Sequence, residues 1–333
     1  MPVARETPPT LSIVVAAYNE QDVLALFFAR LQAVLEELGE SYEILCVNDG
    51  SRDRTAEILN AAHAADPRIK VVHLARNFGK ELALTAGLDH ATGQAVVPLD
   101  ADLQDPPELI AEFLHHWREG FDVVFAVRDD RETDSWLKRT SAAAFYRMLG
   151  RLSNVEIPRN AGDFRLMDRR VVDALKQLRE RNRFMKGLFS WVGFRQTSVT
   201  YRRPERAAGK TKFNYWKLWN LALDGITGYS TVPLRIAGYS GLVFAFIAML
   251  YGAYLMARTM LFGVDVPGYA SLMVAVVFMG GVQLVVLGII GEYLGRMYNE
   301  AKQRPLYIID STLGLPATDR DTVVLPARQR SGA

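Results

Sequence analysis

The first half of the chain alternates between short apolar runs and longer segments whose apolar residues recur at helical spacing. The apolar runs are rich in Val and Ile and predict strands at residues 11–17, 42–47, 69–74, 95–99 and 121–127. The segments between them predict helices at residues 21–38, 52–65, 80–90 and 108–117. Several of the strands are apolar on both faces, as in a parallel sheet covered by helices. The pattern therefore predicts a doubly wound α/β domain with right-handed crossovers.

The second half contains two long apolar runs, residues 236–257 and 269–291, which carry no charged residue. Each run exceeds the roughly 20 residues that a helix needs to cross the hydrocarbon core of a bilayer. A buried core helix would normally show a polar face, and neither run has one. We therefore expect transmembrane helices at residues 234–258 and 269–293, joined as a hairpin.

The basic residues indicate which side of the membrane the hairpin ends face. Those that precede the first run are Arg202, Arg203, Arg206, Lys210, Lys212, Lys217 and Arg235. Arg296, Lys302 and Arg304 follow the second run, whereas Asp265 balances Arg258 near the connection. By the positive-inside rule, the α/β domain and both termini are predicted to be cytoplasmic.

The segment before the first run and the two termini complete the expected domain organisation. Residues 213–233 mix aromatic residues with lysines, which is typical of a helix lying in the membrane interface, although a helix docked on the α/β domain would show the same pattern. Residues 1–10 lack the apolar core of a secretory signal and are expected to be a flexible N-terminus. We expect residues 294–333 to form a cytosolic tail.

The overall composition excludes some classes of protein. The formal net charge of the 333 residues is +2, so the bulk charge does not predict a nucleic-acid partner. Cys46 is the single cysteine, and it lies in an apolar run, so no disulfide forms within the chain.

Two carboxylates one residue apart follow the fourth predicted strand. Asp100 and Asp102 lie where open α/β sheets bind their ligands, at the carboxyl end of a strand, and carboxylate oxygens suit Mg²⁺ or Mn²⁺. A plain polar turn, with Asp105 capping the next helix, is the alternative interpretation.

Polar side chains also follow the first three predicted strands. They are Tyr18, Asn19 and Glu20 after the first strand, Asp49 after the second, and Arg76 and Lys80 after the third. Neither a G-x-G-x-x-G nor a P-loop sequence is present, which disfavours dinucleotide dehydrogenases and P-loop NTPases. Polar groups at four strand ends make a nucleotide site at this edge the better interpretation.

These segments together resemble a known enzyme family. They are VVAAYNE at residues 14–20, VNDGSRD at 47–53, RNFGK at 76–80, DADLQDPP at 100–107, GDFRLM at 162–167 and GKTKF at 209–213. With the apolar hairpin, they resemble the family 2 glycosyltransferases that transfer a sugar to a polyprenyl phosphate. The resemblance implies a GT-A fold, which is a Rossmann-like, mostly parallel α/β domain, over residues 11–212.

The resemblance also implies roles for individual residues. Asp100, Asp102 and Gln104 would hold Mg²⁺ or Mn²⁺, and Asp163, with Asp102, would be catalytic. The nucleotide-sugar would contact Ala17, Tyr18, Glu20, Asp49, Lys80, Asp100 and Asp102. The acceptor phosphate would contact Arg128, Arg131, Arg202, Arg206 and Lys210. For residues 202–212, simple attraction to the anionic inner leaflet is an equally good interpretation.

The reaction implied by the resemblance is the inverting transfer of one hexosyl unit from a nucleotide-diphosphate sugar to undecaprenyl phosphate. UDP-glucose is the first expectation for the donor, with N-acetylglucosamine, mannose and aminoarabinose as alternative sugars. A phosphate monoester is already largely anionic at neutral pH, so we expect Asp163 to position substrate rather than remove a proton. The resemblance further implies a bacterial inner-membrane protein that forms a homo-oligomer, with a tetramer expected. A membrane-anchored nucleotide-sugar sensor without turnover is the alternative outside enzymes.

Overall fold

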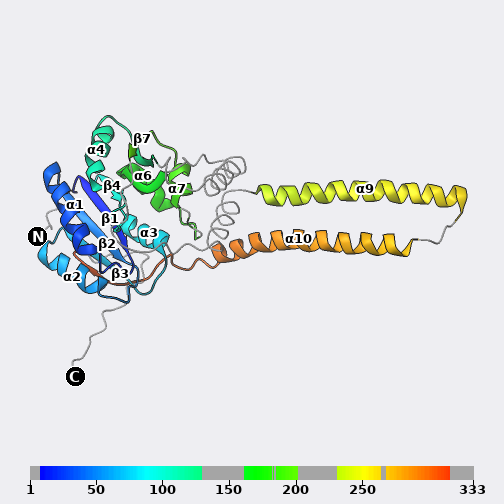
Figure 1. Ribbon diagram of the computed structural model, residues 1–333, viewed down its shortest axis with the longest axis horizontal. Coiled ribbons are helices and arrows are strands. Elements are labelled where there is room, and N and C mark those ends of the chain that lie inside the picture. Colours follow the sequence, from blue (N-terminus) through cyan, green and yellow to red (C-terminus); the bar gives the residue numbers. More distant parts are fainter. Residues whose placement is uncertain are drawn as a thin grey trace, which may run out of the picture. The chain divides into compact units, whose positions relative to one another are not determined.

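The computed structural model describes residues 8–129, 161–181, 183, 185–201, 231–263 and 268–315 (Figure 1). The chain divides into two units: one comprises Met1–Arg147, Val155–Leu218 and Arg304–Ala333, and the other comprises Met148–Asn154 and Trp219–Gln303. Arg131, Arg202, Arg206, Lys210 and the expected interfacial helix up to residue 230 lie outside the described residues.

The first unit is built on one mixed sheet. Its described strands are β1 (Leu11–Ala17), β2 (Tyr42–Asn48), β3 (Ile69–Leu74), β4 (Ala95–Pro98), β5 (Val123–Arg128), β6 (Ala161–Asp168), β7 (Gln196–Tyr201) and β8 (Ile309–Leu313). They form an eight-stranded sheet in the order β7-β5-β6-β4-β1-β2-β3-β8. The pairs among β1 to β4 and the β5–β7 pair are parallel, whereas β6 and β8 run antiparallel to their neighbours. The expected mostly parallel α/β sheet is confirmed.

Helices cover both faces of the sheet (Figure 1). They are α1 (Leu24–Leu38), α2 (Thr55–Ala65), α3 (Lys80–His90), the 3₁₀ turn η1 (Pro107–Leu109), α4 (Ile110–Arg118), α6 (Arg169–Gln177) and α7 (Met185–Trp191). Successive strand residues point to opposite faces, so Ile13 and Val15 pack with α1, α2 and α4, whereas Val14 packs with α3, α6 and α7. These two apolar layers explain why the strands are apolar on both faces.

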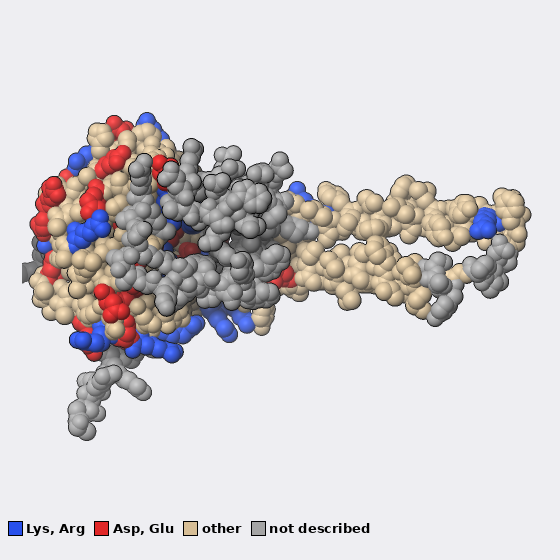
Figure 2. Space-filling view, viewed as in Figure 1, with Lys and Arg blue, Asp and Glu red and all other residues tan. Residues whose placement is uncertain are grey.

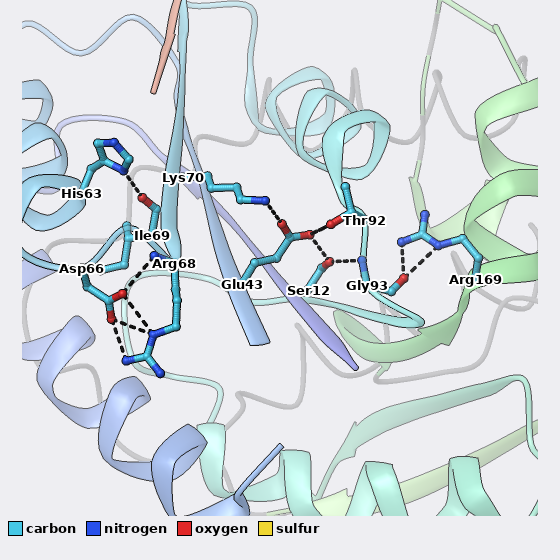
Figure 3. Close-up of polar contacts among 10 residues, drawn as sticks. All are labelled: Ser12, Glu43, His63, Asp66, Arg68, Ile69, Lys70, Thr92, Gly93 and Arg169. Carbon is cyan, nitrogen blue, oxygen red and sulfur yellow. Dashed lines mark hydrogen bonds and ion pairs between the residues drawn. The ribbon is translucent and has the colours of Figure 1, made fainter. Parts of the chain in front are cut away.

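A buried carboxylate ties together the starts of the strands (Figure 3). Glu43 of β2 is 2% exposed and accepts hydrogen bonds from Ser12 Oγ at 2.5 Å, Lys70 Nζ at 2.6 Å and the Thr92 backbone N–H at 2.7 Å. Burial alone would raise the pKa of Glu43, but these donors outweigh it and lower the pKa. The network joins β1, β2, β3 and the turn before β4 at the strand starts, which leaves the carboxyl ends for ligands.

The second unit contains two long apolar helices, α9 (Val232–Phe262) and α10 (Tyr269–Ala301). Both are long and apolar enough to cross a membrane, as expected, and both extend beyond the predicted ends at residues 258 and 293. Their side chains pack on each other at places such as Phe244 and Phe278, whose ring centroids lie 5.8 Å apart. On the face that Figure 2 shows, the described parts of both helices present almost only uncharged side chains. Such a surface is stable in lipid and not in water.

The segment after α10 does not form the simple tail that we expected from residue 294. Residues 309–313 form β8, which pairs antiparallel with β3 through partners such as Val71–Leu313 and His73–Ser311. The hydroxyl of Tyr307 donates to Asp89 Oδ2 of α3 at 2.8 Å and holds the segment just before β8 against α3. The chain thus returns to the first unit, where β8 covers the edge of β3.

Candidate active site

The loops after β1 and β2 are joined by hydrogen bonds at the carboxyl edge of the sheet. The backbone N–H of Asn19 donates to Ser51 Oγ at 3.0 Å, and Asn19 Oδ1 accepts from the Arg52 backbone N–H at 2.9 Å. The Glu20 backbone N–H donates to Thr55 Oγ1 at 2.9 Å. Asn19 has a φ of 55°, a left-handed conformation that asparagine tolerates better than most residues. The two loops therefore form one rigid wall of the site.

Asp49 connects this wall to the loop before α3. Its backbone N–H donates to the Ala17 carbonyl at 2.9 Å, and its carboxylate accepts from the backbone N–H groups of Phe78 at 2.6 Å and Gly79 at 2.9 Å. The side chain is buried, and this burial raises its pKa despite the two backbone donors. Asp49 thus holds the loop in place, while its expected contact with the nucleoside stays a prediction.

The loop also depends on a close backbone approach at Gly50. A Cβ at this position would lie 2.4 Å from the backbone carbon of Arg76, and Gly50 has a φ of +63°. Only glycine satisfies both conditions without distortion. The loop that carries Arg76 and Lys80 is therefore fixed from two sides.

Lys80 brings two of the predicted site carboxylates together. It is the first residue of α3, and its ammonium group lies 2.8 Å from Asp100 Oδ2 and 2.8 Å from Asp163 Oδ2. Desolvation lowers the pKa of Lys80, but the two carboxylates outweigh it and raise the pKa. The pKa of Asp163 is lowered because Lys80 outweighs burial there, whereas burial prevails at Asp100 and raises its pKa.

The turn after β4 has the features expected of a cation site. Asp102 Oδ1 accepts the backbone N–H of Gln104 at 3.1 Å, and the intervening Leu103 has a φ of 59°, although its side chain is buried. A leucine in this conformation is strained, and such strain clusters at functional sites. Gln104 is 4% exposed, and its Oε1 has no hydrogen-bond partner among the described residues. An unpaired buried carbonyl oxygen suits the third ligand position that we predicted.

Asp105 does not cap the following helix, which corrects our alternative interpretation of this turn. The helical segment begins at Pro107 after an extended Pro106, with no side-chain cap. Instead, Asp105 is buried and accepts the hydroxyl of Tyr201 at 2.5 Å, with Arg128 Nη2 at 3.7 Å. Arg128 Nε donates to the same hydroxyl at 3.2 Å. Arg128 therefore braces this turn, and its predicted contact with the acceptor phosphate stays a prediction.

A cleft of about 880 Å³ opens at the ends of β2 and β3. Of the residues predicted to bind the nucleotide-sugar, Tyr18 lines it, together with Asn48, Arg76 and two residues that the sequence analysis missed, His73 and Asp310. His73 Nδ1 lies 3.0 Å from Asn48 Nδ2, and burial lowers the pKa of His73, which favours the neutral ring. Ile308 and Ile309, directly before Asp310, were a sequence signal for a strand at this place.

The sequence analysis also missed charged groups beside Asp163. Arg165 is buried, with its guanidinium carbon 4.0 Å from the centroid of the Phe189 ring and its Nη2 donating to the Gly162 carbonyl at 2.8 Å. Glu81 accepts the Met185 backbone N–H at 3.2 Å, and burial, reinforced by Asp163, raises its pKa to about 7. Arg165 lies within the GDFRLM motif and Glu81 directly follows the RNFGK motif, which was the sequence signal for these two groups.

The geometry agrees with comparisons to known proteins. Residues 12–176 match the model of "Glycosyl transferase family 2", and residues 232–297 match "GtrB C-terminal hairpin". An uncharacterized glycosyltransferase of Synechocystis is 56% identical over 92% of this chain and 96% of its own length. The chain is a member of glycosyl transferase family 2. This family 2 enzyme is also 50% identical to a prophage bactoprenol glucosyl transferase homolog of Escherichia coli, over 90% of this chain and 98% of that protein.

Solved structures of glycosyltransferases match this enzyme more distantly. A mannosyltransferase of Pyrobaculum calidifontis, in complex with GDP-Man and Mn²⁺, covers 87% of this chain and 88% of its own, with a TM-score of 0.43 and 16% identity. Glucosyl-3-phosphoglycerate synthase of Mycobacterium tuberculosis, with Mn²⁺ and UDP, covers 66% of this chain and 76% of its own, with a TM-score of 0.43 and 20% identity.

Proposed function

We propose that this enzyme transfers one hexosyl unit from a nucleotide-diphosphate sugar to a polyprenyl phosphate at the inner leaflet of the bacterial plasma membrane. The first support is the 50% identity, over nine-tenths of the chain, to a protein of Shigella phage SfV named bactoprenol glucosyl transferase. The second is the pair of membrane-capable helices within the same chain as the sugar-transfer domain. UDP-glucose is the proposed donor, because the relatives are named for glucosyl transfer.

The residues at the turn after β4 fit a divalent cation. Among the described residues no group of three His, Cys, Asp or Glu side chains is arranged to hold a metal. The proposed ligands are two carboxylates, Asp100 and Asp102, and the buried amide oxygen of Gln104, which has no hydrogen-bond partner among the described residues. Mg²⁺ and Mn²⁺ sites of this kind are completed by substrate phosphates and water. When bound, the cation would neutralise the charge that develops on the departing nucleoside diphosphate.

The residues of the chain itself orient the reaction. The rigid loops after β1 and β2 and the cleft beside Tyr18 would hold the nucleoside. A phosphate oxygen of the acceptor attacks the anomeric carbon on the side opposite the diphosphate, and the C–O bond to the diphosphate breaks. The configuration at that carbon therefore inverts. Asp163, with Oδ1 unpaired among the described residues and Oδ2 held by Lys80, would position the sugar or the acceptor.

The lipid acceptor explains the hairpin. Helices α9 and α10 would embed in the bilayer beside the prenyl chain while the phosphate reaches the cytosolic site. The excess of Lys and Arg outside the connection between the two helices supports cytoplasmic termini. Binding of the phosphate by Arg128, Arg131, Arg202, Arg206 and Lys210 stays a prediction, as does the homo-oligomer.

The observation that carries the proposal is the convergence of Lys80, Asp100 and Asp163 at the carboxyl edge of the sheet. A sensor that only binds a nucleotide-sugar needs a nucleoside cleft, but it does not need a carboxylate such as Asp163 beside the diphosphate site. This arrangement favours turnover over sensing.

The test is sugar transfer by the full-length protein in detergent with undecaprenyl phosphate. Radiolabelled UDP-glucose, UDP-N-acetylglucosamine, GDP-mannose and a UDP-aminoarabinose donor are compared, each with Mn²⁺, with Mg²⁺ and with EDTA. We expect a butanol-extractable, acid-labile product from UDP-glucose that EDTA abolishes. Product from another donor alone would replace glucose by that sugar. Nucleotide binding without product from any donor would favour the sensor.

A further inference from the structure

The ammonium group of Lys80 occupies the place between a predicted cation ligand and the predicted catalytic carboxylate. It lies 2.8 Å from Asp100 Oδ2 and 2.8 Å from Asp163 Oδ2. These carboxylates come from the end of β4 and from β6, which are neighbours in the sheet. Like charges held close in a partly desolvated site repel each other, so a cation is needed there to stabilise their ionised forms. In this structure Lys80 supplies that positive charge.

The contact has the character of a replaceable ion pair. The Lys80 side chain is 46% exposed, so its flexible four-carbon stem can carry the ammonium group to another partner without opening the core. By contrast, Arg165 is buried against Phe189 and cannot leave its place without opening the core. Of these two cations, Lys80 is therefore the one that is able to move.

A divalent cation at Asp100 would conflict with Lys80 in its present position. Both would compete for Asp100, and the two positive charges would repel each other across a few ångströms. A nucleoside diphosphate brings negative charge to the same place, and Lys80 starts a helix whose N-terminal backbone also favours anions. The diphosphate can therefore bind the Lys80 ammonium group after Lys80 has left Asp100.

We infer that Lys80 is an exchangeable counter-ion, which neutralises Asp100 and Asp163 in the free enzyme and moves to the diphosphate when the divalent cation and the donor bind. The inference rests on the proposed function, because it takes the donor to be a nucleotide-diphosphate sugar. It follows that cation binding and diphosphate binding assist each other through Lys80. Such coupling is reciprocal, since each ligand must tighten the other by the same factor.

The test measures Mn²⁺ affinity directly, by electron paramagnetic resonance of free Mn²⁺, with the full-length protein in detergent. Wild type is compared with Lys80→Met and Lys80→Gln, in buffer alone, with UDP and with uridine, which lacks the diphosphate. Without nucleotide, we expect both variants to bind Mn²⁺ about tenfold more tightly than wild type. With UDP, wild type should gain Mn²⁺ affinity strongly, and the gain should be about tenfold smaller in the variants. Uridine should have no effect.

Two control variants separate exchange from a general effect of charge. Lys80→Arg keeps the charge, so its Mn²⁺ affinity without nucleotide should stay near that of wild type. Lys186→Met removes a charge that also acts on Asp163 but leaves the Lys80 contacts in place, so the gain on adding UDP should persist. Thermal melting shows whether each variant is folded.

The outcomes separate the inference from the proposed function. If wild type binds Mn²⁺ with UDP but the Lys80 variants show the same affinities and the same gain, the exchange is refuted and the proposed reaction stands. If Lys186→Met loses the UDP-induced increase in Mn²⁺ affinity to the same extent as the Lys80 variants, the exchange with the diphosphate is also refuted. The same holds if a short-chain polyprenyl phosphate, added in place of UDP, causes the same increase in Mn²⁺ affinity. If wild type binds no Mn²⁺ even with UDP, the cation-dependent reaction and the inference both fail.

Discussion

The ammonium group of Lys80 lies 2.8 Å from a carboxylate oxygen of Asp163, a residue 83 positions later in the chain. The contact joins the start of α3 to β6, and Lys80 also holds Asp100 at the end of β4. Three segments that are distant in sequence thereby present their charges at one edge of the sheet. Four predictions follow from this edge and from the network at the opposite one.

Replacing Asp163 by asparagine tests whether this residue positions substrate or removes a proton. We expect Asp163→Asn to lower kcat by about a hundredfold or more. If the carboxylate positions substrate, the acidic limb of the pH–rate profile should persist in the variant, because it reports the second ionisation of the acceptor phosphate, with a pKa near ~6. Because Lys80 lowers the pKa of Asp163, a general base at this position would instead give wild type an acidic limb below about pH 4, and that limb would be lost in the variant.

A matched control for this variant is Asp173→Asn. Asp173 is exposed and forms a long ion pair, at 3.6 Å, with Arg169, which lies one helical turn before it. The Asp173→Asn variant should keep a transfer rate within about twofold of wild type, since exposed ion pairs contribute little to stability. A loss of only a few-fold in Asp163→Asn would contradict both roles.

Removing the Asp49 carboxylate should release the loop before α3. Asp49→Ala leaves the half-buried backbone N–H groups of Phe78 and Gly79 without their partner, which costs about 1 kcal/mol. We expect a lower unfolding temperature and a higher KM for the donor with a smaller change in kcat. Gly50→Ala should have the same effects, since its methyl group would displace the Arg76 backbone. Unchanged donor binding in both variants would show that this loop does not carry the nucleotide.

Glu81 predicts a dependence of stability on pH. Burial raises its pKa to about 7, so the folded protein favours the protonated form and loses stability as the pH rises from about 4.5 through 7. Glu81→Gln removes this loss. The stability of the variant relative to wild type should therefore rise between pH 5 and pH 8, by about 2 kcal/mol. Thermal melts across this range measure the difference, and a constant difference would contradict a raised pKa.

Glu43 should contribute to stability and not to catalysis. Glu43→Ala leaves the ammonium of Lys70 and the hydroxyl groups of Ser12 and Thr92 without their acceptor. Removal of one partner of a buried ion pair lowers the free energy of unfolding by about 3 kcal/mol or more. Because the pKa of Glu43 is lowered in the fold, its contribution is present at neutral pH and is lost as the pH falls through that pKa. The melting difference from wild type should therefore shrink on acidification.

The exposed pair Arg54–Glu57 provides the control for Glu43. Its two side chains are 78% and 73% exposed, so Arg54→Ala should change the free energy of unfolding by less than about 1 kcal/mol. Equal effects of the two substitutions would show that the network around Glu43 does not hold the strand starts together.

Much of the fold could be predicted from local patterns. The helix at residues 80–90 was predicted with its observed bounds, because a loop glycine precedes it and its apolar residues recur at helical spacing. The two apolar helices followed from length and composition alone. Their ends were less accurate, because polar residues such as Glu292 and Arg296 continue α10 through an ion pair at 2.8 Å. Local composition does not show where a helix with paired charges stops.

The site could be predicted as a set of residues but not as a set of contacts. Asp100, Asp102 and Asp163 stand out by motif, yet nothing local shows that Lys80 joins Asp100 to Asp163. The role of Asp105 was misread because the turn resembles a helix cap, whereas Tyr201 provides its hydrogen bond from a distant strand.

Periodicity and composition were enough to predict a covered α/β sheet, two membrane-capable helices and acidic residues at strand ends. These features follow from the burial preferences of residues that are close together in the chain. The pairing of β8 with β3, the cleft beside Tyr18 and the partner of each charge became evident from the folded structure. Those depend on which distant strands become neighbours in the sheet, and a hydrogen bond or an ion pair forms only when the fold has brought its two groups together.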